Sequence, residues 1–182
     1  MKVLVSGATG YSGAPLCRRL AERGNEVIAL SRNGARGVAL QHPRITPVKM
    51  DITSKSDLNS AIRQCETCFH LAAIARPWAR DPGQFKQTNV DATRELLERA
   101  LQARLRRVVF TSTASVFGPA PETNPIAETS PVATEIDSDY ERSKLACEGF
   151  VGEFQADGLD IVTVYPTRVY GPGPMTRNNA VT

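Results

Sequence analysis

Short apolar segments alternate with helical patterns along the whole 182-residue chain, and this alternation restricts its fold more than any other feature. The segments expected to be strands are Lys2–Ser6, Val27–Leu30, Ile45–Met50, Thr67–Ala72, Arg107–Ser112 and Ile161–Tyr165. Because strands separated by helices pair in parallel through right-handed crossovers, one parallel sheet is expected. Near-continuous apolar strands are typical of a sheet covered on both faces. The sequence therefore predicts an α/β fold: a doubly wound parallel sheet of about six strands, with its ligand site beyond the carboxyl ends of the strands.

Apolar residues at helical spacing fill the intervals between these strands. Helices are expected after the first glycine-rich turn as far as Arg23, and over Ser54–Arg63, Pro82 to about Ala103, and Ser138 to about Ala156. Gly24 and Gly158 follow the first and the last of these helices, where C-terminal glycines commonly occur. The proline-rich segment from Gly118 to Pro131 is expected to be a loop.

Composition excludes several classes of protein. Hydrophobic residues make up 41% and charged residues 23%, which is ordinary globular usage and excludes a disordered tail or a collagen-like fibre. The formal net charge is only +3 and the basic residues are scattered, whereas a nucleic-acid-binding protein concentrates them on one face. The apolar runs are too short to cross a bilayer, and the N-terminal run is too short for a signal peptide. We therefore expect a cytoplasmic protein with no nucleic-acid partner and no membrane segment.

The chain has four cysteines, of which Cys65 and Cys68 form a C-x-x-C pair. A redox pair would lie at a helix N-terminus, where the thiolate is stabilised, but this pair leads into an expected strand. A zinc site would need two more ligands at metal spacing, and none is evident. His42 and His70 are the two histidines and lie in unrelated segments. We therefore expect buried, reduced thiols and no metal site.

A glycine-rich turn, Gly7-Ala-Thr-Gly10-Tyr-Ser-Gly13, directly follows the first strand. Gly7 lets the chain leave the strand in a sharp turn, and Gly10 removes a side chain that would keep a pyrophosphate away from backbone N–H groups. Gly13 allows the following helix to pack close to the sheet. The helix N-terminus then offers unpaired donors and a partial positive charge. Because the pattern follows a strand and opens a helix, it predicts a dinucleotide-binding turn.

The end of the second strand indicates which dinucleotide is bound. An acidic side chain there accepts hydrogen bonds from the adenosine ribose and repels a 2′-phosphate. This chain has Ser31 and Arg32 instead, with Arg36 close by in sequence. A serine does not repel the phosphate, and an arginine pairs with it through its planar guanidinium. We therefore expect NADP(H) as the cofactor, with NAD(H) as the alternative; the competing interpretation makes Arg32 a solvated loop residue.

Tyr140 and Lys144 are four residues apart in an expected helix, so they lie on one face of it. A free phenol has a pKa of about 10, and about 4 kcal/mol of preferential stabilisation of the phenolate would bring that pKa near 7. An ammonium one turn away and an oxidised nicotinamide, both positively charged, could supply such stabilisation. Tyr140 is thus a candidate acid–base group that exchanges a proton with an alcohol or ketone while hydride moves to or from the nicotinamide.

Three motifs resemble those of the extended branch of the short-chain dehydrogenase/reductase superfamily, the epimerase/dehydratase-like family. They are Gly7-x-x-Gly10-x-x-Gly13, Tyr140-x-x-x-Lys144 and Thr111-Ser-Thr-Ala-Ser-Val-Phe-Gly118. The resemblance implies a Rossmann fold. It gives Thr113 the position of the catalytic Ser/Thr, whose hydroxyl hydrogen-bonds the reacting oxygen, with Ser112 as the neighbouring candidate. It also implies that Asn89, in Asn-Val-Asp-Ala-Thr, helps to position the active-site elements.

The resemblance further implies which residues contact the cofactor. Asp51 and Ile52 resemble the pair that holds the adenine, and Leu71-Ala72-Ala73 resembles the segment whose small residues let the backbone lie against the cofactor. Pro166 and Val169 resemble the segment that packs under the nicotinamide. The full expected set is Gly7, Thr9, Gly10, Tyr11, Gly13, Ser31, Arg32, Asp51, Ile52, Leu71, Ala72, Ala73, Ser112, Tyr140, Lys144, Pro166 and Val169.

The chain also departs from the family pattern. Ala114 and Ser115 stand where the sugar-nucleotide 4,6-dehydratases carry an Asp-Glu pair for the elimination, so loss of water by that route is not expected. Extended family members carry more chain after the Tyr-Gly-Pro segment, and it forms most of the substrate pocket. We therefore interpret residues 1–174 as an NAD(P)-binding Rossmann domain and residues 175–182 as the start of a truncated substrate-binding region.

Two functions remain open at this point. The first is an NADP(H)-dependent oxidoreductase or epimerase that transfers hydride at a secondary alcohol or ketone of a small-molecule substrate, with a nucleotide-sugar as one candidate. The second is a truncated, catalytically silent dinucleotide-binding module, such as a redox sensor or a partner-binding fragment. The helices Pro82–Ala103 and Ser138–Ala156 resemble those of the family's four-helix dimer interface, so a homodimer is also expected.

Overall fold

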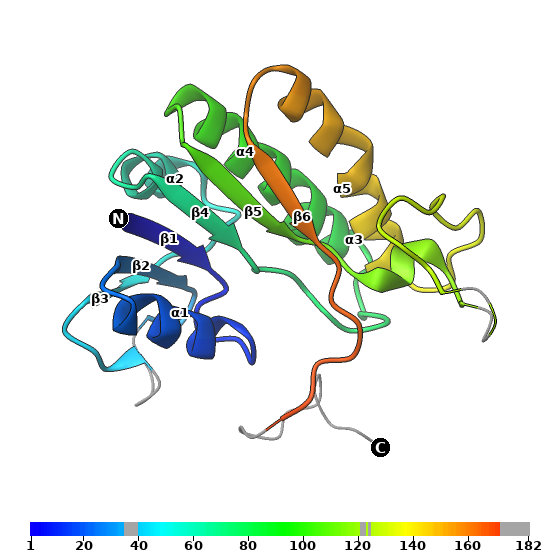
Figure 1. Cartoon of the computed structure of the whole chain (residues 1–182), viewed down its shortest axis with the longest axis horizontal. Coiled ribbons are helices and arrows are strands. Elements are labelled where there is room, and N and C mark those ends of the chain that lie inside the picture. Colours follow the sequence, from blue (N-terminus) through cyan, green and yellow to red (C-terminus); the bar gives the residue numbers. More distant parts are fainter. Residues whose placement is uncertain (35–39, 121–122, 124, 172–182) are drawn as a thin grey trace.

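The computed structural model describes residues 1–34, 40–120, 123 and 125–171, and these form an α/β fold around one six-stranded sheet (Figure 1). The strands are β1 (Lys2–Ser6), β2 (Glu26–Ser31), β3 (Ile45–Lys49), β4 (Thr67–His70), β5 (Arg107–Thr111) and β6 (Ile161–Val164). They lie in the order β3-β2-β1-β4-β5-β6, and every neighbouring pair is parallel. The predicted doubly wound sheet of six strands is therefore confirmed. The region expected over residues 175–182 lies outside the described residues.

The winding of the chain decides which helix lies on which face. The helices are α1 (Gly13–Glu22), α2 (Lys55–Ile62), α3 (Gly83–Phe85), the π-helix η2 (Lys86–Asp91), α4 (Ala92–Gln102), the 3-10 helix η3 (Ala114–Phe117) and α5 (Asp139–Ala156). Right-handed crossovers that move in opposite directions along a sheet place their helices on opposite faces. The crossover from β1 to β2 moves towards one edge, and the crossovers that lead to β4, β5 and β6 move towards the other. Consequently α1 lies on one face, and α2, α4 and α5 lie on the opposite face (Figure 1).

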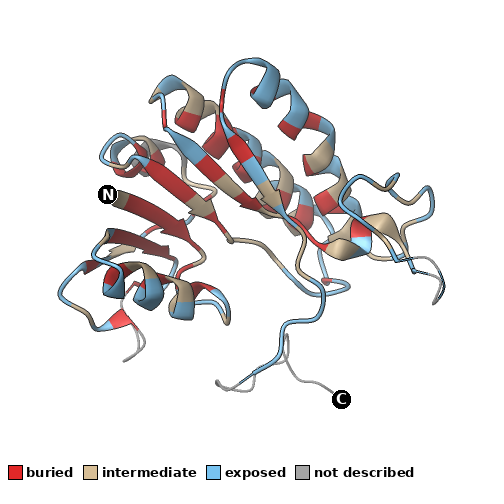
Figure 2. Ribbon diagram, in the orientation of Figure 1, coloured by how far each residue is buried: buried red, intermediate tan, exposed pale blue. Residues whose placement is uncertain are grey.

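Two hydrophobic clusters fill the space between the sheet and its helices. Alternate residues of β1 point to opposite faces, so Leu4 joins the cluster under α2, α4 and α5, whereas Val3 and Val5 join the cluster under α1. All three side chains are completely buried. Figure 2 shows this burial along the central strands, where helices cover both faces of the sheet.

The expected cover on both faces is only partly correct. On the α1 side of the sheet, β6 presents Val162 and Val164, which are 40% and 38% exposed, whereas Ile161 on the other side is buried (Figure 2). The reason is that the crossovers leading to β4, β5 and β6 all place their helices on the opposite face. In the described part of the chain, α1 packs against β1, β2 and β3, and its cover does not reach β6.

The two neighbouring strands β1 and β4 form the topological switch point of the sheet. The chain leaves them in opposite directions, which opens a crevice at their carboxyl ends. The glycine-rich turn follows β1, and Leu71-Ala72-Ala73 follows β4, so two of the segments expected to bind the cofactor lie at this crevice.

The prediction of one continuous helix from Pro82 to about Ala103 is wrong. The structure divides this segment into α3, η2 and α4, and α4 ends at Gln102. A π-helical turn accommodates an extra residue, and such turns are frequent at functional sites. Here the turn contains Asn89, whose side chain is completely buried. Apolar spacing at α-helical intervals could not reveal this turn, because the extra residue changes the phase of the pattern.

Other expected boundaries differ by one or two residues, mostly at the carboxyl edge of the sheet. The expected strand residues that lie just beyond the observed strands are Met50, Leu71, Ala72, Ser112 and Tyr165. The short helix η3 was not expected within the segment that follows β5. No helix in the described ranges is both long and apolar enough to span a membrane.

Candidate active site

At its narrowest point the crevice between β1 and β4 has room only for backbone. Gly7 has φ +70°, in the left-handed region that favours glycine. A Cβ atom at Gly7 would lie 2.8 Å from the main-chain nitrogen of Ala72, so the two segments that flank the crevice touch through their backbones. Leu71, Ala72 and Ala73 are half-buried. A ligand in the crevice would therefore lie against main chain from both strands.

The N-terminus of α1 forms one wall of the same crevice. A Cβ atom at Gly13, the first residue of α1, would overlap the carbonyl oxygen of Gly7. Within the described turn, the N-cap Ser12 makes no side-chain hydrogen bond to the helix, and the first turn contains no acidic residue. Thr9 and Gly10 are exposed beside it. Pro15 has no N–H, and the N–H groups of Ala14 and Leu16 donate to the carbonyl oxygens of Gly10 and Ser12 at 3.1 and 3.2 Å. The N–H of Gly13 and the positive end of the helix dipole are thus what the first turn offers to a pyrophosphate.

Tyr11 connects the glycine-rich turn with the segment that follows β6. Its phenol donates a hydrogen bond of 2.5 Å to the carbonyl oxygen of Gly171. In Figure 1 this segment runs from the end of β6 across the carboxyl edge of the sheet. Pro166 begins it, and its carbonyl oxygen accepts a 3.0 Å hydrogen bond from the N–H of Ala114. Val169 is exposed, so the structure places it at this edge without packing it into the protein.

Ser31 and Arg32 end β2 on the other side of the glycine-rich turn. The hydroxyl of Ser31 is buried and donates a 2.8 Å hydrogen bond to the carbonyl oxygen of Gly34. Arg32 is exposed, whereas Arg36 lies outside the described residues. Because the Ser31 proton already has a partner, Arg32 is the described side chain best able to pair with a phosphate here.

Asp51 and Ile52 follow β3 near the same corner. The N–H and the hydroxyl of Thr53 donate hydrogen bonds of 3.0 and 2.8 Å to Asp51 Oδ1. These bonds lower the pKa of the Asp51 carboxyl, and the charge of Arg32 adds to their effect. Asp51 is exposed, so its carboxylate is available to an adenine amine. Ile52 is only 8% exposed and packs in the larger core cluster, which leaves little of its surface for an adenine ring.

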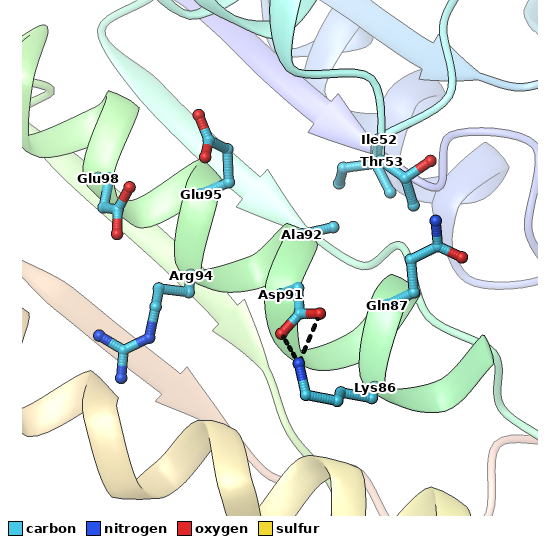
Figure 3. Close-up of a pocket in the computed structure, with 9 residues that line it drawn as sticks. All are labelled: Ile52, Thr53, Lys86, Gln87, Asp91, Ala92, Arg94, Glu95 and Glu98. Carbon is cyan, nitrogen blue, oxygen red and sulfur yellow. Dashed lines mark hydrogen bonds and ion pairs between the residues drawn. The ribbon is translucent and has the colours of Figure 1, made fainter. Parts of the chain in front are cut away.

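A cavity of about 440 Å³ lies beside α4 and η2. Its lining residues are Ile52, Thr53, Lys86, Gln87, Asp91, Ala92, Arg94, Glu95 and Glu98. Figure 3 shows Lys86 and Asp91 pointing towards each other along η2, with Lys86 Nζ 2.8 Å from both carboxylate oxygens. None of the predicted catalytic residues lines this cavity. The candidate active site is therefore the carboxyl edge of the sheet.

Tyr140 lies in the first turn of α5, whose start is fixed by a capping box. The hydroxyl of Ser138 accepts a 3.2 Å hydrogen bond from the N–H of Glu141, and the Glu141 carboxylate accepts one of 3.2 Å from the N–H of Ser138. Burial raises the pKa of the Tyr140 phenol, and a hydrogen bond with the Thr113 side chain partly opposes this effect. The structure thus brings Thr113 and Tyr140 together. Thr113 also caps η3, because its hydroxyl accepts a 3.3 Å hydrogen bond from the N–H of Ser115.

Lys144 lies one turn further along α5 and is 3% exposed. Its ammonium donates a 2.7 Å hydrogen bond to the carbonyl oxygen of Thr111 and lies 5.0 Å from the centre of the Phe110 ring. Burial lowers the pKa of Lys144 to about 8. Burial dominates and raises the pKa of Tyr140. The acidification expected from Lys144 together with an oxidised nicotinamide stays a prediction. A further positive charge beside the phenol would be needed to reverse that direction.

Asn89 joins three parts of the site through its side chain. Its Nδ2 donates hydrogen bonds to Ser143 Oγ at 2.8 Å and to the carbonyl oxygen of Ile74 at 3.1 Å. Its Oδ1 accepts a 2.7 Å hydrogen bond from the N–H of Ile74. The amide thus holds the loop after β4 against Ser143 of α5, the residue that precedes Lys144. These contacts support the positioning role of Asn89, which stays a prediction.

Ser112 supplies a test of whether the site fits a dinucleotide. It is 2% exposed, and its hydroxyl has no hydrogen-bond partner among the described residues. A buried hydroxyl without a partner costs about 1–3 kcal/mol, which a ligand at that point would recover. Together with the backbone contact at Gly7 and the open N-terminus of α1, this unpaired group fits a nicotinamide dinucleotide along the crevice.

Four buried polar residues around Asn89 have no role in the sequence analysis. They are Ser6, His70, Thr93 and Ser143. Ser6 and His70 are opposite each other in the paired strands β1 and β4. A polar residue at the end of each of these two apolar strands was the sequence signal that could have identified them. Both ring nitrogens of His70 contact hydroxyl groups. In the part of the chain that the structure describes, no group of three or more His, Cys, Asp or Glu side chains is arranged to hold a metal ion.

Comparison with known proteins decides the family. The sequence pattern of the NAD dependent epimerase/dehydratase family matches residues 3–182. The chain belongs to this family. Among its relatives in the epimerase/dehydratase family, the 3-beta-hydroxysteroid dehydrogenase of Mycolicibacterium neoaurum is 32% identical over 182 residues, covering 96% of this chain and 49% of that protein. The UDP-glucose 4-epimerase of Streptomyces lividans is 34% identical over 170 residues, covering 90% of this chain and 50% of that protein.

Solved structures of epimerases share the fold of this epimerase/dehydratase-family chain. The UDP-glucose 4-epimerase of Thermus thermophilus in complex with NAD superposes with a TM-score of 0.86 at 28% identity, covering 98% of this chain and 60% of that one. The Bacillus cereus UDP-glucuronic acid 4-epimerase in complex with NAD gives a TM-score of 0.81 at 27% identity, covering 94% and 58%. The chain spans about half the length of the curated relatives it matches.

Proposed function

We propose that this chain is the dinucleotide-binding and catalytic part of a nicotinamide-dependent oxidoreductase or epimerase that acts at a secondary alcohol or a ketone. The observation that carries the proposal is that the Thr113 side chain lies close enough to the Tyr140 phenol to lower its pKa. This contact lies at the carboxyl end of β5, with Lys144 one helical turn away. A hydroxyl beside a phenol at that edge is suited to hold one reacting oxygen and exchange a proton with it.

The described side chains can divide the work of such a reaction. When bound, a nicotinamide would accept or give the hydride. Thr113 would donate a hydrogen bond to the reacting oxygen, and Tyr140 would transfer the proton. Because burial raises the pKa of Tyr140, the phenol is protonated at neutral pH and ready to protonate a ketone oxygen. Lys144, whose pKa is about 8, stays mostly charged at pH 7 and would stabilise the phenolate that forms.

The substrate class is proposed from the site and from the relatives together. The two relatives named above act, by their names, on a hydroxysteroid and on a UDP-sugar, and both carry a secondary alcohol. A reductase releases its product after one hydride transfer, whereas an epimerase returns the hydride to the other face of the same carbon. The turn η3 that follows Thr113 carries no acidic residue, so elimination of water is not part of the proposal.

For the cofactor we favour NADP(H). Ser31 stands at the end of β2 where a carboxylate would repel a 2′-phosphate, and the exposed Arg32 follows it. The solved epimerases named above hold NAD. Titration of the protein with NADPH and with NADH, followed by fluorescence, compares the two directly. Tighter binding of NADH would overturn the preference and would leave the nicotinamide proposal in place.

We also propose that the chain associates as a homodimer through α4 and α5. These helices lie side by side on one face of the sheet (Figure 1). Arg94 of α4 lies 4.4 Å from the centre of the Phe150 ring and pairs with Glu153 at 3.4 Å, so the two helices form one layer. Sedimentation at micromolar concentration is expected to give twice the monomer mass. A monomer throughout that range would contradict the assembly.

Turnover decides between an enzyme and a silent binding module. The purified chain is titrated with NADPH and then assayed with nucleotide-sugars, hydroxysteroids and simple ketones. Tyr140→Phe is expected to keep dinucleotide binding and to lower kcat by about 10²- to 10⁴-fold, because the phenyl ring retains the shape and lacks the proton. Binding without turnover on any substrate would favour the silent module. Absence of dinucleotide binding would overturn the proposal as a whole.

A further inference from the structure

His70 is completely buried at the end of β4 and lies between two hydroxyl groups. Its Nδ1 is 2.7 Å from Ser6 Oγ, at the end of β1, and its Nε2 is 2.8 Å from Thr93 Oγ1, on α4. The imidazole therefore joins two central strands to a helix that covers them. The proposed reaction uses none of these three side chains.

The partners of Ser6 fix the direction of these hydrogen bonds. The N–H groups of Leu71 and Ala72 each donate a 3.1 Å hydrogen bond to Ser6 Oγ. These two bonds occupy both lone pairs of the hydroxyl, so its single proton is donated to Nδ1 of His70. His70 must then carry its own proton on Nε2 and donate it to Thr93 Oγ1. A doubly protonated ring would leave the Ser6 proton without an acceptor.

The next bond passes from Thr93 to the main chain of the π-helical turn. Thr93 Oγ1 donates a 2.5 Å hydrogen bond to the carbonyl oxygen of Asn89, four residues earlier. The Cys147 thiol of α5 donates to the same oxygen at 3.1 Å. Asn89 is thus held through its main chain by α4 and α5, and through its side chain by Ser143 and Ile74.

The last bond reaches the proposed acid–base residue. Ser143 Oγ accepts from Asn89 Nδ2 and donates a 2.6 Å hydrogen bond to the carbonyl oxygen of Tyr140. Ser6, His70, Thr93, Asn89 and Ser143 therefore form one connected set, here called the buried polar chain. It begins beside Gly7 at the cofactor crevice and ends at the main chain of the residue that would transfer the proton.

We propose that Thr93 is a positioning residue, which through the buried polar chain holds Asn89, and with it the first turn of α5, in register with the crevice between β1 and β4. The role rests on the proposed function, because it sets the place of Tyr140 relative to a bound nicotinamide. Thr93 touches neither the substrate nor the cofactor. It acts through the Asn89 carbonyl on one side and the His70 ring on the other.

Two properties of the buried polar chain favour a positioning role over a purely structural role in packing. Every hydrogen bond from Ser6 to Asn89 has one fixed direction, so a change at one end is transmitted to the other. Burial lowers the pKa of His70 to about 3, and the charge of Lys144 adds to this effect. The ring therefore stays neutral across the working pH range and keeps its protonated Nε2 directed at Thr93.

Paired variants at Thr93 test the proposal. Thr93→Val keeps the shape and removes the hydroxyl, whereas Thr93→Ser keeps the hydroxyl. Thr46→Val, on the exposed edge strand β3, is the matched control. We expect Thr93→Val to lower kcat about tenfold or more while the Kd of the dinucleotide changes less than about twofold, since a buried hydrogen bond is lost away from the ligand. Thr93→Ser is expected to recover most of the lost kcat.

Three outcomes would overturn this role. They are an unchanged kcat in Thr93→Val, an equal loss of kcat and dinucleotide affinity, and a Thr93→Ser variant as impaired as Thr93→Val. If Thr93→Val does not fold, nitrogen-15 NMR of the wild-type His70 ring still decides. We expect a proton on Nε2 and none on Nδ1. The opposite tautomer would contradict the hydrogen-bond directions of the buried polar chain.

The same measurements separate this proposal from the proposed function. If wild-type protein binds no dinucleotide, the function fails and the positioning role fails with it. If wild-type protein binds and turns over, and only the predictions for Thr93 fail, the function stands and the positioning role alone is lost.

Discussion

The ammonium of Lys144 donates a 2.7 Å hydrogen bond to the main-chain carbonyl of Thr111, at the carboxyl end of β5. Helix α5 is thereby tied to the strand whose end carries Thr113. The same bond places a charged group almost out of contact with water, since Lys144 is 3% exposed. A buried charge with few partners is costly, and this cost has measurable consequences.

The burial of Lys144 predicts a stability that depends on pH. The pKa of Lys144 falls from 10.5 to about 8 in the folded protein, so the unfolded chain binds more protons between these values. Stability is therefore expected to rise from pH 8 to pH 10.5, by on the order of 3 kcal/mol for this group. Lys144→Met keeps the stem and removes the titration.

Urea unfolding of both proteins at pH 8 and pH 10 isolates this contribution. The free energy of unfolding of the wild type should increase relative to that of Lys144→Met as the pH rises. A constant difference between the two proteins would show that the ammonium is solvated.

The Thr113 hydroxyl is expected to act in the chemical step. Thr113→Val removes a donor to the reacting oxygen and should lower kcat by about 10²- to 10³-fold, whereas Thr113→Ser should retain most of it. Because Thr113 also caps η3, Thr113→Val should cost about 1 kcal/mol of stability. Steady-state kinetics and thermal unfolding, measured on the same preparations, separate the two effects. Equal kcat values for Thr113→Val and wild type would remove Thr113 from the mechanism.

The overlap that a side chain at Gly13 would make predicts the effect of Gly13→Ala. The new methyl group would meet the main-chain carbonyl of Gly7, which has no flexible end that can give way. We expect a loss of about 2 kcal/mol or more and much weaker dinucleotide binding, because the turn must move away from α1.

Gly149→Ala is the matched control, since a Cβ there meets nothing within 4 Å. It lies inside α5 and should stabilise the protein by about 0.5–1 kcal/mol. Unfolding at two protein concentrations removes any contribution from assembly. A Gly13→Ala protein as stable as wild type would mean that the helix does not pack this closely.

Arg32 is expected to distinguish the two nicotinamide dinucleotides. Arg32→Gln should weaken NADPH binding by about 10- to 100-fold and leave NADH binding nearly unchanged, because only NADPH carries the 2′-phosphate. Arg18→Gln, an exposed change on α1, controls for net charge. Calorimetric titration with each dinucleotide gives the comparison. Equal weakening for both would assign Arg32 to the shared part of the ligand.

Local patterns predicted much of the fold. The strand and helix alternation specified a parallel sheet, and the glycine spacing specified the turn between β1 and α1. Both are recorded in local features, namely the periodicity of the apolar residues and the glycine spacing, which a linear pattern can show. The edge position of β3 also agrees with Pro47, which cannot donate a hydrogen bond within a sheet.

The places where prediction failed depend on contacts between distant segments. The π-helical turn at Asn89 is accompanied by partners at Ile74 and Ser143, of which the second is 54 residues away. Ile52 packs in the larger core cluster, a burial that its sequence position does not reveal, and its contact with the adenine, which the family resemblance implies, stays a prediction. The pKa of Tyr140 rises because neighbouring elements exclude water, which no spacing between Tyr140 and Lys144 can express.

By itself the sequence determined the order of the elements, the glycine-rich turn and the candidate residues Thr113, Tyr140 and Lys144. The order of the elements and the turn follow from backbone geometry, and Tyr140 and Lys144 follow from their spacing along one helix. Thr113 follows from the resemblance to the family. Only the tertiary structure decided that Thr113 lies beside Tyr140, that Lys144 bonds to β5, and that a buried polar chain links β1 to α5. The physical reason is that desolvation and hydrogen-bond partnership are properties of the packed interior, where segments far apart in sequence share one small volume.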